Sequence, residues 1–113
     1  MYDIRWDQGA KEDMKAMKLR PYEVGQLVDA VEEHLTYQAE RESKRKQIIR
    51  PDEQLPFEHL EPVWQLRVGE FRVFYDVSKS KGHEADEPGE YEGVVSIRAV
   101  RRQPAHKTTR EIL

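Results

Sequence analysis

Residues 63–77 read Val-Trp-Gln-Leu-Arg-Val-Gly-Glu-Phe-Arg-Val-Phe-Tyr-Asp-Val, and the fold prediction rests on this stretch. Apolar and polar residues alternate on both sides of Gly69-Glu70, a Gly-X pair of the kind that forms tight type II′ hairpin turns. The stretch therefore predicts two antiparallel strands joined at this turn. With two residues in the turn, Val68 lies opposite Phe71, and the pairing continues outward from there.

This register gives the hairpin two different faces. One face is apolar, with pairs such as Leu66 opposite Val73. The other face puts Arg67 directly across from Arg72, and like charges in opposite positions destabilise a sheet. Either acidic neighbours neutralise the arginine pair, or the surface binds an anion.

The length and composition indicate one domain, residues 1–113, with a modest core. Charged residues make up 36% of the chain, so the core must come from a few amphipathic elements. There is no cysteine, which excludes disulfides and thiolate metal sites. No run approaches the roughly 18 apolar residues of a membrane span, and no signal-peptide pattern opens the chain. We therefore expect a cytoplasmic protein without membrane contact.

The formal net charge of −3 argues weakly against a general nucleic-acid-binding protein. The charges are unevenly distributed, however. Acidic residues gather in residues 84–92, whereas basic residues gather in 41–50 and 98–110. The sequence thus predicts local cationic surfaces on an acidic protein.

The N-terminal third predicts a strand followed by two helices. Residues 2–6 alternate between apolar and polar side chains, which is typical of a strand, and Asp7 then offers an N-cap for a short helix. A second helix is expected from Pro21 to about Glu40. Its apolar residues form one stripe, Val24, Leu27, Val28, Val31 and Leu35. Two such helices are expected to pack as a hairpin against one face of a sheet.

The remaining segments predict loops, one more strand and a terminal turn. Residues 51–62 hold three prolines and predict a connecting loop, and residues 78–92 predict a mobile loop or an extended hairpin tip. Residues 93–101 regain strand character. Thr108 and Glu111 have the spacing of a capping box, which favours a short helical turn.

The order of elements predicts an α+β domain. A strand and a helical hairpin precede a mainly antiparallel sheet of three to four strands, with the helices on one face. If Ile97 lies in the core and no bulge interrupts the last strand, Arg98 and Arg102 lie on the other face. That face, with Arg67 and Arg72, is then open and cationic.

Metal and nucleophile chemistry find no support in the sequence. The histidines show neither HxxxH nor HExxH spacing, and the serines lack the context of a nucleophile elbow. Gly69 is a turn glycine and not part of a phosphate-binding loop. We therefore expect neither a metal nor a cofactor.

The positive signal is a set of cationic side chains that the predicted sheet brings together. Guanidinium groups suit bidentate contacts to phosphate and can stabilise charge that develops in a transition state. His106 is the nearby side chain best suited to move protons, because imidazole titrates close to neutrality. The candidate RNA-contacting residues beside Arg72 and Arg102 are Arg67, Arg98, Lys44, Lys46 and Arg50.

Structural explanations compete with each of these assignments. Arg67 or Arg72 can instead pair with Glu70, Asp76 or another acidic residue of the fold. Residues 41–50 can be the solvated end of the second helix, where cations are favourable against the helix dipole. His106 alone can be a surface histidine.

The hairpin sequence resembles the central signature of the RelE/ParE toxin superfamily, W-x-L-R-V-G-x-[FY]-R-V-x-Y. The order of elements is also similar, so the resemblance covers nearly the whole chain. It implies a toxin of a toxin–antitoxin pair. RelE-like members cut messenger RNA in the ribosomal A site without a metal, whereas ParE-like members act against DNA gyrase.

The resemblance also implies roles for individual residues. Arg72 matches the signature arginine that contacts the scissile phosphate, and Arg102 resembles the second catalytic arginine. Lys44, Lys46 and Arg67 fall where such toxins place basic residues. The usual terminal aromatic has no counterpart, since Thr108 stands there, and the resemblance implies His106 as its substitute.

Three functional hypotheses follow. The first is an endoribonuclease that cleaves translated messenger RNA on the ribosome, with Arg72, Arg102 and His106 as catalytic residues. The second is a ParE-like inhibitor that binds DNA gyrase and performs no chemistry. The third is a non-toxic relative that serves as an interaction module. Both toxin hypotheses imply a cognate antitoxin as partner.

Overall fold

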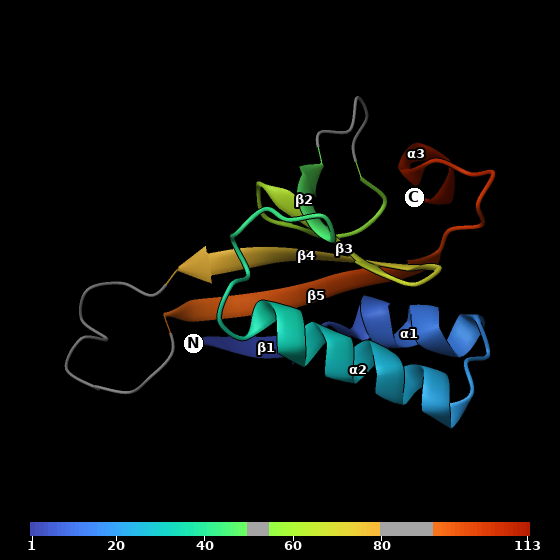
Figure 1. Cartoon of the computed structure of the whole chain (residues 1–113), viewed down its shortest axis with the longest axis horizontal. Helices are drawn as coiled ribbons and strands as arrows, with labels where there is room; N and C mark the ends of the chain where they lie inside the picture. The colour runs from blue at the N-terminus through green and yellow to red at the C-terminus, as the bar shows by residue number, and fades with distance from the viewer. Residues whose placement is uncertain (50–54, 80–91) are drawn as a thin grey trace.

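The computed structural model of the chain describes residues 1–49, 55–79 and 92–113 (Figure 1). Its first half contains strand β1 (Tyr2–Trp6), helices α1 (Gln8–Ala16) and α2 (Pro21–Leu35), and strand β2 (Lys46–Ile49). Its second half contains β3 (Val63–Val68), β4 (Phe71–Lys79), β5 (Gly93–Arg102) and the short helix α3 (Thr109–Ile112). None of the helices in these ranges is long and apolar enough to cross a membrane.

The strands form one sheet in the order β1-β5-β4-β3-β2. The predicted α+β class is confirmed, but the sheet has five strands and is mixed, whereas we expected a mainly antiparallel sheet of three to four strands. The parallel pair is β1 with β5, where Ile4 lies opposite Val95. Helices α1 and α2 lie on one side of the sheet and α3 lies on the other (Figure 1).

The hairpin of β3 and β4 has the predicted register. Val68 pairs with Phe71, and Arg67 pairs with Arg72. Gly69 has a φ of 58°, the positive value that the first central residue of a type II′ turn requires. The sequence of the turn thus fixed which side chains share a face.

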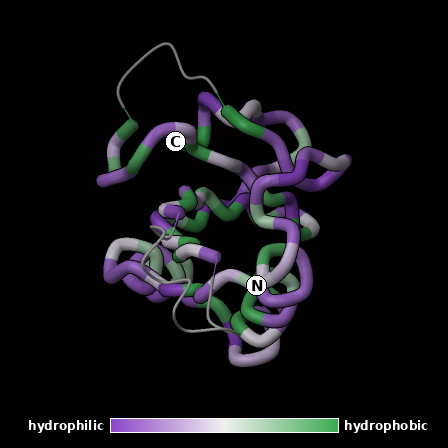
Figure 2. Tube along the Cα trace, turned by 90° about the vertical axis from the view of Figure 1, so that its left-hand side faces the viewer, coloured by the Kyte–Doolittle hydropathy of each residue, from purple (hydrophilic) through white to green (hydrophobic). Residues whose placement is uncertain are grey.

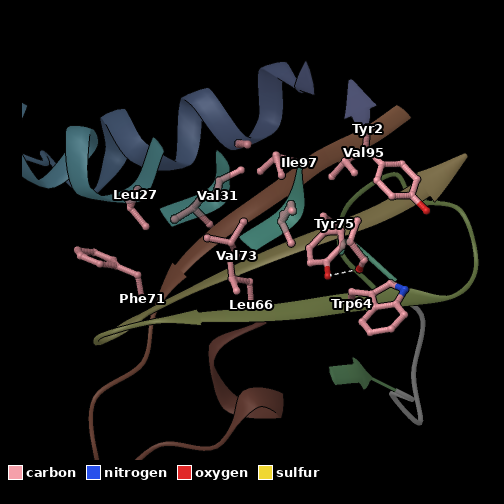
Figure 3. Close-up of a cluster of buried hydrophobic side chains, with 14 residues drawn as sticks. Tyr2, Leu27, Val31, Trp64, Leu66, Phe71, Val73, Tyr75, Val95 and Ile97 are labelled. Carbon is pink, nitrogen blue, oxygen red and sulfur yellow. Dashed lines mark hydrogen bonds between the residues drawn. The ribbon is translucent and has the colours of Figure 1, made fainter. Parts of the chain in front are cut away.

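The main core lies between the sheet and helix α2. Leu27 and Val31 of α2 are completely buried and point toward Val73 and Ile97 of the sheet (Figure 3). The hydroxyl of Tyr75 donates a 2.7 Å hydrogen bond to the carbonyl oxygen of Ala39 just beyond the helix. The helix stripe predicted from three- and four-residue spacing therefore faces the sheet.

A second, smaller core lies on the opposite face of the sheet. Val63, Phe74 and Ala99 are buried there together with Leu55. Phe57, Ile112 and Leu113 pack against this cluster. Figure 2 shows hydrophobic segments both in the layer that holds the C-terminus and in the rest of the chain. The face that we expected to be open is therefore partly covered.

Several predicted boundaries differ from the structure. Helix α2 ends at Leu35, and the basic run contains strand β2 instead of a helix end. In the predicted loop 78–92, Ser78 and Lys79 belong to β4, and residues 80–91 lie outside the described residues. The predicted capping box of Thr108 and Glu111 is present at the start of α3.

Candidate anion-binding site

A β-bulge decides which arginines share the face of Arg72. Phe74 pairs with Ala99, but Tyr75 pairs with Ile97, so Arg98 is an extra residue in β5. An extra residue reverses the alternation of side chains beyond it. Arg101, and not Arg102, therefore lies opposite Arg72. The prediction that Arg102 shares a face with Arg72 assumed an unbroken strand, and it is wrong because of this bulge.

Arg102 lies on the other side of the sheet, where acidic and aromatic neighbours hold it. Its guanidinium lies 5.0 Å from the centre of the Phe71 ring. It forms ion pairs with Glu70 at 3.1 Å and with Glu23 of α2 at 3.8 Å. The structure therefore does not bring the two residues expected to form a catalytic arginine pair, Arg72 and Arg102, together.

Arg98 is on the face opposite the helices but is enclosed by carboxylates. Its Nε lies 2.7 Å from Oδ2 of Asp76, and its Nη1 lies 2.6 Å from Oδ2 of Asp7. The hydrogen bond with Asp76 is the main cause that raises the pKa of Arg98. Asp76 is fully buried and also accepts a 2.8 Å hydrogen bond from the backbone N–H of Leu60. Arg98 thus links β5 to β4 and to the start of α1, and it is this arginine, instead of Arg67 or Arg72, that pairs with Asp76.

Among the described residues, Arg67 and Arg72 form a pair of like charges without an acidic partner. Only 7% of Arg72 is exposed, and its Nη1 donates 2.8 Å hydrogen bonds to the carbonyl oxygens of Gly69 and Phe71. Burial, and then the charge of Arg67, lower the pKa of Arg72. In the described part of the chain, no carboxylate lies within ion-pair distance of either guanidinium.

Arg101, the arginine of β5 that pairs with Arg72, has its charge neutralised by Asp13. The Nη1 of Arg101 donates to Oδ2 of Asp13 on α1. The same carboxylate oxygen accepts a 3.0 Å hydrogen bond from the backbone N–H of Val100. Helix α1 thereby covers the outer edge of β5. Of the three arginines Arg67, Arg72 and Arg101, only the two on the β3–β4 hairpin lack a carboxylate partner among the described residues.

A pocket of about 440 Å³ lies over this hairpin. The sheet contributes Arg67, Arg72, Gln65 and Gln47 to its lining. The segment after β5 contributes the remaining residues, Gln103, Pro104, Ala105, Lys107 and Thr109. Three cations and no carboxylate are present among these residues, so the pocket suits an anion.

The C-terminal segment is fixed where it forms one wall of the pocket. The hydroxyl of Thr109 donates a 2.8 Å hydrogen bond to Oε1 of the buried Gln65. The amide of Gln103 donates a 2.7 Å hydrogen bond to the carbonyl oxygen of Lys107. Beyond them, Ile112 packs against the second core. This wall is therefore part of the fold.

Sequence reasoning missed most of this wall. On the sheet side of the pocket, the alternation along residues 63–68 predicts that Gln65 shares a face with Arg67. In the wall itself, only Lys107 was indicated, because it belongs to the basic run 98–110. Nothing in the sequence indicated that Gln103 or Thr109 would fold back over the hairpin. That contact depends on the second core, which the sequence did not reveal.

The basic segment before β3 does not contribute the predicted cations to the pocket. Lys46 is buried, and its Nζ donates to the carbonyl oxygens of His34 and Gln38 near the end of α2, at 3.1 Å and 2.7 Å. Burial lowers its pKa. Lys44 is exposed and is not among the pocket residues. Arg50 lies outside the described residues.

His106 is exposed in the turn before α3. Its neighbours Ala105 and Lys107 line the pocket, but His106 does not. Among the described lining residues, none has a side chain that ordinarily titrates near neutrality. The arrangement therefore provides charge and hydrogen-bond donors for an anion, without an acid–base group at hand.

Within residues 1–49, 55–79 and 92–113, no group of three or more His, Cys, Asp or Glu side chains is arranged to hold a metal ion.

In comparisons with known proteins, the chain matches no family model, no curated protein and no solved structure.

Proposed function

We propose that the protein binds the phosphate backbone of RNA in the pocket over the β3–β4 hairpin. We further propose that it is a RelE-like toxin that cleaves translated messenger RNA on the ribosome. The observation that carries this proposal is the uncompensated pair of Arg67 and Arg72 in the pocket floor. Like charges in register on a sheet are unfavourable, and a bound phosphate removes that cost.

Arg72 is suited to orient a phosphodiester. Its Nη1 is fixed by the carbonyl oxygens of Gly69 and Phe71, so the planar group is held in place before the ligand arrives. Donors fixed in this way stabilise negative charge that develops on phosphate without a reorganisation step. Arg67 and Lys107 add positive charge to the same pocket. The pocket volume of about 440 Å³ is within the usual range for small-molecule sites, so a nucleotide-sized group fits.

In this proposal, proton transfer falls to His106, in the same turn as the lining residues Ala105 and Lys107. The turn must bring the imidazole within hydrogen-bond reach of the scissile group when RNA binds. Arg102 has no part in this reaction, because it lies on the other side of the sheet with Glu23 and Glu70.

The test is growth inhibition on expression, together with primer extension of a translated message on ribosomes. Arg72→Ala is expected to abolish both growth inhibition and cleavage. Arg102→Ala is the matched control, because it removes an arginine from the opposite face and is expected to leave cleavage intact. Full toxicity of Arg72→Ala would refute the catalytic proposal.

A second candidate function is binding without chemistry. It is favoured by the absence, among the described lining residues, of a group that ordinarily titrates near neutrality. A ParE-like protein of this kind would leave messenger RNA intact and cause gyrase-dependent DNA breaks. A non-toxic interaction module would be harmless on expression and would not bind ribosomes. In either toxin case we propose that an antitoxin covers the cationic pocket.

A further inference from the structure

A second pocket lies between helices α1 and α2, which cover the other side of the sheet (Figure 1). It measures about 410 Å³, and we call it the α1–α2 groove. Its floor is apolar and consists of the half-buried side chains of Met14, Leu19 and Val24. Its remaining lining residues are three exposed lysines, Lys11, Lys15 and Lys18.

The groove is built by the way in which α1 ends. The backbone N–H of Leu19 donates a 3.4 Å hydrogen bond to the carbonyl oxygen of Met14. The backbone N–H of Lys18 donates a 3.0 Å hydrogen bond to the carbonyl oxygen of Lys15. This pair of hydrogen bonds is the Schellman motif, in which the residues corresponding to Met14 and Leu19 usually form an apolar contact. Met14 and Leu19 both line the groove, together with Val24 of α2.

Lys18 occupies the position in this motif where glycine is strongly preferred. Its φ is 54°, in the left-handed region, and it is the only non-glycine residue with a positive φ in the described part of the chain. This conformation is unfavourable for a residue with a Cβ. The chain thus has a strained lysine whose side chain lines the groove. Strain of this kind is often found where a residue binds a ligand.

The charges of these three lysines have no carboxylate partner in the part of the chain that the structure describes. Lys11 and Lys15 are four residues apart and Lys18 follows three later, so all three lie along one side of α1 and its end. Three adjacent ammonium groups around an apolar floor repel one another in the free protein.

From this combination we propose that the α1–α2 groove docks an acidic amphipathic segment of a partner protein. Apolar side chains of the segment enter the floor, and its carboxylates meet the three lysines. Grooves that bind amphipathic helices use this division between apolar anchors and a charged rim. The groove is concave, which suits inserted side chains better than a flat lipid surface. The proposal does not depend on RNA binding at the hairpin pocket.

The first test uses a synthetic peptide of about 15 residues, with leucines on one helical side and glutamates on the other. Amide chemical shifts of the full chain are expected to change around residues 11–24, and affinity is expected to fall with added salt. Lys15→Glu should weaken binding about threefold to tenfold, which is the range for one exposed ion pair changed to a repulsion. Lys44→Glu is the matched control, because Lys44 is an exposed lysine outside the groove, and it should bind as the natural chain does.

The second test separates docking from a structural role. Lys18→Gly removes a rim charge and also relieves the left-handed backbone. The variant should melt a few degrees higher yet bind the peptide about threefold more weakly. Unchanged peptide affinity in this more stable variant would overturn the proposal.

Three further outcomes would also overturn it. The peptide could shift the amides around Arg67 and Arg72 in place of those of the groove. The protein could sediment with phosphatidylglycerol vesicles in a Lys15-dependent way, which would assign the groove to membranes. It could instead self-associate through the groove without peptide, which would assign it to a second copy of the chain.

Discussion

Arg67 and Arg72 face each other across two strands without a described carboxylate between them, so their repulsion opposes folding. Arg67→Gln removes the repulsion while keeping a polar side chain on an exposed position. We expect the free energy of unfolding to rise by roughly 0.2–1 kcal/mol. We also expect a weaker affinity for a single-stranded RNA oligomer, because one pocket cation is lost. Urea unfolding and fluorescence anisotropy measure the two effects.

The control for this prediction is another arginine of the same sheet. Arg98→Gln leaves the fully buried Asp76 without its ion partner. Breaking a buried pair in this way typically costs about 3–5 kcal/mol. If Arg67→Gln also destabilises the protein by more than about 1 kcal/mol, the arginine pair does not carry an uncompensated repulsion.

His59 provides a prediction about pH at the residue scale. Its Nδ1 lies 3.0 Å from the carbonyl oxygen of Phe57, and its Nε2 lies 3.1 Å from Oε1 of Glu61. These contacts, the backbone hydrogen bond first, raise the pKa of His59 above its usual value of 6.5. A raised pKa in the folded state means that the protonated form stabilises the fold. This stability is fully present below pH 6.5 and is lost as the pH rises through the higher, folded-state pKa.

The measurement is the urea midpoint at pH values below 6.5 and well above it. The natural chain should lose stability across this interval relative to His59→Gln, which cannot titrate. Parallel curves for the two proteins would show that His59 does not couple protonation to folding.

At the scale of elements, Lys46 connects strand β2 to the end of helix α2. Its ammonium satisfies the carbonyl oxygens of His34 and Gln38 while its side chain is buried. Lys46→Met keeps the apolar length and removes both hydrogen bonds. We expect a loss of about 1–3 kcal/mol in the free energy of unfolding, because the carbonyl oxygens lose their donor. RNA affinity should change little.

Lys44→Met is the control, because it changes an exposed lysine two residues away and should stay within about 0.5 kcal/mol of the natural chain. A folded, stable Lys46→Met protein that no longer binds RNA would contradict the capping role and restore the RNA-binding assignment made from the sequence.

The same elements show what the sequence could and could not predict. The pairing of β3 with β4 was predictable because a two-residue turn and strict alternation determine every opposite pair. The bulge at Arg98 was not, since the alternation of residues 93–101 fits an unbroken strand equally well. Strand β2 was not predicted, because its four residues lie inside a basic run and a lysine such as Lys46 is usually exposed to solvent. The arginine pair was therefore foreseen, and its neighbours were not.

At the scale of the whole molecule, the sheet separates two cationic surfaces of different character. The hairpin pocket holds arginines on one side, and the α1–α2 groove holds lysines around an apolar floor on the other. At physiological salt, exposed charges separated by more than about 8 Å are largely screened from each other. The two surfaces share no lining residue. They are therefore expected to bind their ligands independently.

The corresponding experiment titrates a labelled single-stranded RNA oligomer with and without saturating acidic peptide. We expect RNA affinities that agree within about twofold, which corresponds to the additivity found for separate sites. The double variant Arg67→Gln/Lys15→Glu should show the sum of the two single effects on each ligand. A peptide that displaces the RNA would mean that one partner segment reaches both faces of the sheet. The pocket and the groove would then have to be treated as parts of a single binding surface, because electrostatic repulsion or attraction between the two sites is screened and could not by itself displace the RNA.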